Sequence, residues 1–492
     1  PRSTLFPYTT LFRSGLSIGL TSCLLIVLYI HHELSYDTMH TNADRIYRVG
    51  LNAKISDQET KTTVTSPSLA FTTVEELPEV ENATRIFHFF GAQTIRYGET
   101  TIVEEKVFFA DSTFFDVFSF QLLAGDPASA LTEPNTVVLT EEMAQKYFGH
   151  ESALGQTLLV GDEKIPHEVT GVAENLPSNV HFHFNMLRSM ASLELSRDDD
   201  WFSNSFITYL LLHEGTSLES LDAKLSGLVE KYVGPEVQQY MGVSLETFIQ
   251  QGNQYGYFLQ PLLDIHLYSN LQEELAPNSD ITYVYILGAI AFFIILLACI
   301  NFMNLATARS ANRAKEVGVR KTLGSLRSSL VGQFMTESVV LSLIATSLAV
   351  VAASLLLPSF GHIAGKEISS ALFTNPWFML SLLGLMLVVG LLAGSYPAFY
   401  LSSFRPVEVL KGKLKAGVKS SGIRNTLVVF QFFISITLII CTLLVYQQLE
   451  YIRTKNLGFE KENVVSVNGI QRLSEGQQLA FKQALLSQSQ VV

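Results

Sequence analysis

The chain has 492 residues, which is longer than one ordinary domain. Hydrophobic residues make up 48% of it and charged residues only 16%, a composition that favours a membrane protein. Its net charge of −12 is unevenly placed, because residues 31–281 carry −24 and the remainder carries +12. An acidic block joined to a basic apolar part excludes nucleic-acid-binding classes, which need a basic face. Cys23, Cys299 and Cys441 all lie in apolar runs, so the acidic block has no disulfide framework.

The first predicted membrane helix follows a stretch that does not fit it. Residues 1–14 resemble translated sequencing-adaptor sequence, and we expect them to be foreign to the protein. Residues 15–33 begin with an uncharged apolar run that is slightly short for a membrane span. They are predicted to form transmembrane helix 1, truncated at its N-terminus. A signal peptide is the alternative, but the polar residues His31, His32 and Glu33 follow where a small-residue cleavage site would stand.

Residues 34–280 are predicted to form one α+β domain outside the cytoplasm. Alternation of apolar and polar residues predicts strands at Thr136–Leu139 and Glu168–Val172. Glu141–Phe148 is predicted to form a short helix ended by Gly149, and Ser217–Val233 an amphipathic helix. His181 and His183 alternate in a way that could suggest a metal site, but they lack a third ligand nearby in the sequence, so we interpret 181–183 as a surface strand.

Four further apolar runs are each long enough to cross a bilayer, at 281–305, 330–357, 377–400 and 426–446. The loops at 306–329 and 401–425 are rich in Lys and Arg, which places them in the cytoplasm. The short loop at 358–376, the acidic domain and the tail at 447–492 then lie outside. With five spans and the N-terminus in the cytoplasm, both basic loops lie inside and all the other connecting segments lie outside.

The loop behind the second span carries the most ordered motif of the chain. It holds six basic residues between Arg309 and Arg327, and Gly318 and Gly324 are expected to bend or end its helix. On that helix Glu316 lies three residues after Arg313 and four before Arg320, so it can hold both arginines. A loop that only fixes membrane topology would need the same charges but no fixed order, and this alternative stays open.

The motif resembles the cytoplasmic coupling region of FtsX/MacB-type permeases, the membrane subunits of a class of ABC transporters. The family pattern A-x-x-R-x-x-E-[IV]-G-[IV]-R-[KR]-x-[LI]-G, followed by Q-F-x-x-E-S, is matched here at Arg313, Glu316, Val317, Gly318, Val319, Arg320, Lys321, Leu323, Gly324, Gln333, Phe334, Glu337 and Ser338. Stretches of residues 109–187 resemble the extracytoplasmic core domain of MacB-type permeases. The resemblance covers nearly all of residues 15–492.

This resemblance implies a permease subunit that couples ATP hydrolysis by a separate cytoplasmic ATPase to movement of the outer domain, for export or extraction of a substrate. It assigns ATPase coupling to Arg313, Glu316, Gly318, Arg320, Lys321, Gly324 and Glu337. We expect Glu337 to pair with one of these arginines, since an unpaired carboxylate in a span is costly. The alternative function is an FtsX-type regulatory protein that senses or controls an extracytoplasmic partner without transport.

The sequence has no G-x-x-x-x-G-K-[ST] motif, so it is not expected to be its own ATPase, and no catalytic residue, cofactor or metal is predicted. The expected partners are an ABC ATPase and membrane lipid. The span at 426–446 leads into a polar neck much as the first span does. This internal similarity indicates a fragment of the long, duplicated form of the family. In that form 447–492 begins a second outer domain, and three more spans follow. A homodimer or a pseudo-dimer through the missing half is the expected assembly.

Overall fold

The computed structural model describes residues 6–88, 91–308, 310–403, 418–455, 467, 470 and 474–488. Within these ranges the side chains of 6–14, 308, 310–315, 418–421, 423, 424 and 475 are outside the description. Residues 1–421 form one unit and 422–492 a second one. The basic loop predicted at 401–425 therefore lies mostly outside the described residues, as does part of the second outer domain predicted at 447–492.

Five described helices are long and apolar enough to cross a membrane, which confirms the predicted five spans. The helices of the membrane part and of the second unit are α1 (Phe6–Leu34), α9 (Ile281–Ala308), α10 (Ser310–Thr322), α11 (Arg327–Ala364), α12 (Pro376–Ser402), α14 (Val418–Thr454) and α15 (Glu475–Leu486). The outer domain lies between the first span and the second, as predicted. Some helices run past the predicted span boundaries: α11 continues two turns beyond Leu357 into the predicted outer loop, and α14 continues two turns beyond Tyr446.

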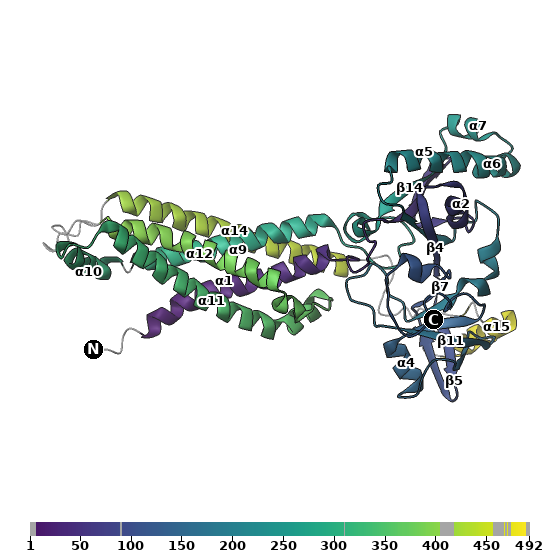
Figure 1. The fold of residues 1–492 in the computed structure, drawn as a ribbon, viewed down its shortest axis with the longest axis horizontal. Helices are drawn as coiled ribbons and strands as arrows, with labels where there is room; N and C mark the ends of the chain where they lie inside the picture. Colours follow the sequence, from purple (N-terminus) through teal and green to yellow (C-terminus); the bar gives the residue numbers. More distant parts are fainter. Residues whose placement is uncertain are drawn as a thin grey trace. The chain divides into compact units, whose positions relative to one another are not determined.

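Helices α1, α9, α11 and α12 lie side by side in the first unit (Figure 1). Small residues let these helices approach closely, as is usual in membranes, where burial of apolar surface gives no advantage. A Cβ atom on Gly394 of α12 would lie 2.6 Å from the Ser338 side chain of α11. Ser342 of α11 also donates a hydrogen bond to the Met386 carbonyl of α12 (3.0 Å). These contacts make α11 and α12 a closely packed hairpin.

The outer domain is built on one sheet with strands β1 (Ile46–Ile55), β2 (Gln58–Thr62), β3 (Val64–Thr65), β4 (Val80–His88), β5 (Gln93–Tyr97), β6 (Thr100–Glu104), β7 (Val107–Ala110), β8 (Leu122–Gly125), β9 (Thr136–Thr140), β10 (Thr157–Val160), β11 (Ile165–Ala173), β12 (Met186–Ser189), β13 (Phe206–Leu212) and β14 (Gln254–Pro261). Their order across the sheet is β14-β1-β13-β4-β7-β12-β9-β11-β10-β5-β6. The pairs β9–β11 and β7–β12 are parallel, and the other pairs along this path are antiparallel.

Short helices cover the sheet: α2 (Leu69–Glu76), α3 (Phe114–Val117), α4 (Glu141–Phe148), α5 (Leu218–Leu228), α6 (Gly234–Met241), α7 (Leu245–Gln250) and α8 (Ile265–Tyr268). Figure 1 shows α5, α6 and α7 at the end that carries β14, and α4 at the end that carries β11 and β5. The predicted strands lie within β9 and β11, and the predicted helix at 141–148 is α4. Gly149 ends α4 with a φ of 63°, which glycine adopts without a side-chain clash.

The inner strand β13 shows how the sheet carries a core on each of its faces. All seven of its residues are buried, and alternate side chains enter opposite cores. Tyr209 and Leu211 belong to a core rich in phenylalanine that contains Phe118 and Phe182. Leu210 and Leu212 face the core under α5. A strand buried on both faces fixes its register firmly, since a slip by one residue would exchange the two faces.

Candidate functional site

The predicted coupling motif folds as a helix that stops sharply. Gly324, at a φ of +95°, follows the last turn of α10, and the Ser325 amide donates to the Arg320 carbonyl (3.0 Å). This is the closure that a left-handed glycine allows at a helix C-terminus. Gly324 therefore ends the helix as predicted, whereas Gly318 lies buried inside it without breaking it. Helices α10 and α11 are separate, so Leu330 belongs to α11 and not to the helix of the coupling motif.

One buried residue fastens α10 to the membrane helices. Val317 is 2% exposed and packs in a small core with Leu330 and Phe334 of α11 and Ala398 and Leu401 of α12. Burying a valine side chain is worth about 1.5–3 kcal/mol. This core holds α10 against the cytoplasmic ends of two spans at once.

Polar contacts reinforce the same attachment. Arg320 forms an ion pair with Glu316 (2.7 Å), and its other amine donates to Gln333 Oε1 of α11 (2.6 Å). Lys321 donates to the carbonyl of Ser402 at the C-terminus of α12 (2.6 Å). A cation is favoured there because the last carbonyls of a helix are unpaired and carry partial negative charge. The exposed Glu316–Arg320 pair contributes only about 0.3–0.5 kcal/mol, so its value lies in orienting Arg320.

The structure brings together four of the seven predicted residues, namely Glu316, Arg320, Lys321 and the turn at Gly324. Arg313 lies in α10 one turn before Val317, but its side chain is outside the described residues. Glu337 is half-buried on α11, one turn beyond Gln333, and its pairing with an arginine stays a prediction. Val319, Leu323 and Leu326 are left exposed beside Arg320, by 46%, 81% and 72%. The motif therefore presents a mixed apolar and charged face next to its buried anchor.

A second polar cluster, which sequence reasoning missed, lies where the spans meet the outer domain. Glu33 at the end of α1 is 1% exposed, and its carboxylate lies 3.1 Å from His266 Nε2 and 3.3 Å from Lys366 Nζ. Lys366 also donates to the Tyr36 hydroxyl (2.7 Å), and the Tyr36 ring stacks on His266. We call Glu33, Tyr36, His266 and Lys366 the junction cluster. Burial opposes the charge on Lys366, yet Tyr36 and Glu33 together raise its pKa.

A buried chain of hydrogen bonds continues from the junction cluster into the sheet. Asp37, which adopts a φ of 59°, lies 2.9 Å from His181 Nδ1, and His181 Nε2 lies 2.8 Å from the Tyr209 hydroxyl on β13. His181 is 3% exposed and lies between β11 and β12, so the prediction of a surface strand at 181–183 is wrong. His40 lies 4.0 Å from Asp37, and burial lowers the pKa of His40 to about 4.

Sequence separation hid these contacts. Glu33 and Lys366 are more than 300 residues apart, and Asp37 and His181 are separated by 144. The available signal was the run of titratable residues directly after the first apolar run, which includes His32, Glu33 and Asp37. Among the described residues, no group of three His, Cys, Asp or Glu side chains is arranged to hold a metal ion.

Comparison with known proteins agrees with the geometry of both regions. The model of the MacB-like periplasmic core domain matches residues 9–228, and that of the FtsX-like permease C-terminal region matches residues 288–406, which include α10, α11 and α12. Together the two models cover more than two thirds of the chain. They place the outer domain and the coupling motif in the same order along the sequence as the structure does.

Individual proteins are similar to this chain at low identity. The macrolide export ATP-binding/permease protein MacB of Pasteurella multocida is 24% identical over 63% of this chain and 43% of its own length. The ABC transporter permease YknZ of Bacillus subtilis is 26% identical over 42% of this chain and 45% of its own. The crystal structure of the periplasmic region of MacB from Actinobacillus actinomycetemcomitans is 13% identical, covering 45% of this chain and 91% of that one with a TM-score of 0.30.

The chain thus spans less than half the length of these two curated relatives. Its two matched regions, the five spans, and the position of the outer domain between the first and second spans point to the same conclusion. The chain belongs to the FtsX/MacB family of ABC-transporter permeases, as a multi-pass bacterial membrane protein with a MacB-like periplasmic core domain.

Proposed function

We propose that this chain works with a separate cytoplasmic ABC ATPase, which binds the exposed face of α10 and moves the spans when it binds and hydrolyses ATP. The observation that carries the proposal is the attachment of α10 to both α11 and α12 through Val317, Arg320 and Lys321. A force applied to α10 must displace both helices, because the anchor is buried and the polar contacts are short. An element that served only as a topological anchor would need no such attachment.

The exposed face of α10 suits a protein partner. Leu323 and Leu326 are exposed apolar side chains beside the oriented guanidinium of Arg320. Protein interfaces combine apolar contacts with arginine, whose planar head binds carboxylates in a fixed geometry. Movement of the outer domain would then export a substrate, as the name of the macrolide export protein MacB describes for that relative, or would extract one from the membrane.

The test exchanges two charges without changing their number. The double variant Glu316→Arg/Arg320→Glu keeps the net charge of the loop and leaves an ion pair possible at the same spacing. We expect it to insert normally, shown by protease protection of the outer domain, and to lose stimulation of the copurified ATPase. Arg320→Lys, which keeps the charge, is the matched control and should retain most of the stimulation. Full stimulation by the exchanged variant would reduce α10 to a topological anchor.

A further inference from the structure

We propose that Lys366 joins the outer end of α11 to the outer domain, so that α11 acts on that domain directly and the two move as one body. The first and second spans enter the outer domain as continuous chain and are therefore obvious routes for motion. Helix α11 has no such covalent connection. Helix α11 packs against α1, and it also reaches the outer domain through the loop that follows it, whose described contacts include the junction cluster.

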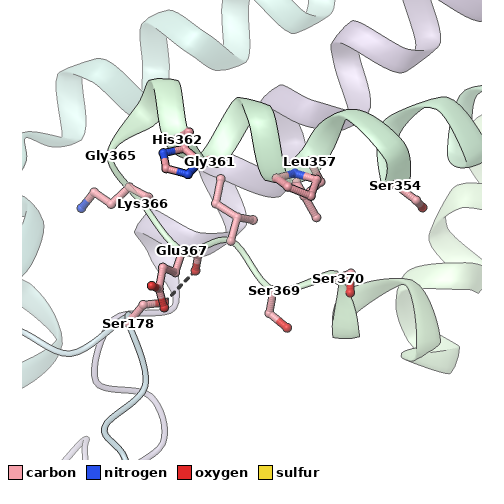
Figure 2. Close-up of a pocket in the computed structure, with 12 residues that line it drawn as sticks. Ser178, Ser354, Leu357, Gly361, His362, Gly365, Lys366, Glu367, Ser369 and Ser370 are labelled. Atoms are coloured by element: carbon pink, nitrogen blue, oxygen red, sulfur yellow. Dashed lines mark hydrogen bonds between the residues drawn. The ribbon is translucent and has the colours of Figure 1, made fainter.

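The loop is built to send Lys366 inward. Gly365, at a φ of +65°, ends α11, and the Lys366 amide donates back to the Gly361 carbonyl (3.1 Å). A Cβ atom on Gly361 would lie 2.7 Å from the Lys366 carbonyl oxygen, so the return is this tight only because residue 361 is glycine. Figure 2 shows the turn among the residues that line a cavity of about 720 Å³, with the Lys366 side chain directed away from Ser369 and Ser370.

Lys366 lies beside the buried carboxylate of Glu33, which requires a compensating positive charge. Glu33 is 1% exposed, and its carboxylate lies 3.3 Å from Lys366 Nζ and 3.1 Å from His266 Nε2. Taking a carboxylate out of water is costly, and removing one partner of a buried pair leaves that cost uncompensated. The Tyr36 hydroxyl accepts a further hydrogen bond from Lys366. The lysine therefore contacts the segment just after α1 as well as Glu33 in α1 itself.

A neighbouring contact ties the same loop to the sheet. The Ser178 hydroxyl, in the segment after β11, donates to the Glu367 carbonyl (2.7 Å; Figure 2). The next residue, Asn179, donates to the Ser35 carbonyl (2.9 Å) and accepts from the Asp37 amide (2.9 Å). From Asp37 the hydrogen bonds run through His181 to Tyr209 in the inner strand β13. Lys366 and Glu367 thus connect α11 to buried parts of the outer domain.

At its other end α11 meets the coupling helix. It has 38 residues, about 57 Å at 1.5 Å per residue, and it begins beside α10, where Leu330 and Phe334 pack on Val317. One continuous helix therefore spans from the α10 anchor to Lys366. This inference rests on the proposed function only for the source of the motion, since the attachment at Lys366 can be measured without an ATPase.

The test measures whether α11 and the outer domain stay fixed to each other. Spin labels are placed on the full chain at Ile363, which is 87% exposed at the end of α11, and at Glu214 on an exposed turn of the outer domain, after Cys441→Ser removes the exposed native thiol. Double electron–electron resonance should give a single narrow distribution of distances between the two labels, and this distribution should not change when ATP and the ATPase are added. Lys366→Met should broaden that distribution already without nucleotide, and Lys366→Arg should keep it narrow.

Tyr36→Phe, which removes one hydroxyl, provides the milder second variant, and it should broaden the distribution less than Lys366→Met. A narrow distribution in both Lys366→Met and Tyr36→Phe would overturn the proposal, as would a wild-type distance that shifts with ATP. ATPase binding and hydrolysis, measured on the same samples, belong to the proposed function. Their absence in the wild type would refute that function while leaving the nucleotide-free distances to decide on Lys366.

Discussion

Acidification should weaken the outer domain through His167. This residue is fully buried in β11, where Nδ1 lies 3.0 Å from the Ile165 carbonyl and Nε2 accepts two hydrogen bonds from Arg188 (3.0 and 2.8 Å). Protonation would place a hydrogen on Nε2 against the guanidinium that now donates to it. Burial, followed by the charge of Arg188, lowers the pKa of His167 to about 4.

The sign follows from linkage between protonation and folding. The ordinary pKa of histidine is 6.5 and the folded value is about 4, so the unfolded chain binds more protons between these values. Stability is therefore complete above pH 6.5 and falls as the pH drops toward 4. The full difference corresponds to about 3 kcal/mol at 1.36 kcal/mol per pKa unit, and about 2 kcal/mol of it is lost by pH 5.

Hydrogen exchange on the whole protein in detergent measures this loss. The free energy of opening for amides of β11 and β12 should fall by about 2 kcal/mol between pH 7.5 and pH 5 beyond the change seen in His167→Gln. Glutamine does not titrate, and its carbonyl can still accept from Arg188. The exposed His150→Gln is the matched control and should keep the wild-type slope. Identical slopes in wild type and His167→Gln would refute the reasoning.

Three further predictions concern packing and domain independence. Gly394→Ala should lower the thermal stability of the membrane part by about 1–3 kcal/mol, because its Cβ would lie 2.6 Å from Ser338, whereas Gly384→Ala on the same helix meets nothing within 4 Å and should not; equal melting in detergent would contradict this. Tyr209→Phe should destabilise the outer domain by about 1–3 kcal/mol, since His181 loses a buried partner, and unchanged denaturant midpoints would argue against it. Residues 34–280 expressed alone should give a soluble, acidic, monomeric α+β domain; insoluble product or an unfolded circular dichroism spectrum would count against it.

The sequence by itself determined the features that depend on local composition. Apolar runs of sufficient length predicted the five spans, because bilayer thickness fixes how long such a run must be. Local patterns also predicted α4 with its terminating Gly149, β9, and the end of α10 at Gly324. The contact between Glu316 and Arg320 was also predictable, because a helix places residues four apart next to each other.

Only the tertiary structure decided which distant groups meet. The attachment of α10 to α12 depends on Lys321 reaching a carbonyl 81 residues away, and no local pattern encodes that. Residues 181–183 were predicted to be a surface strand because polar and apolar residues alternate there. Alternation alone cannot distinguish an exposed strand from a buried loop whose polar groups are hydrogen-bonded, as His181 is. Glu33 and Lys366 come together because α1 and α11 pack along their lengths and end at the same level. Buried polar contacts of this kind are set by the whole fold, since each partner is tolerated inside only when the other is present.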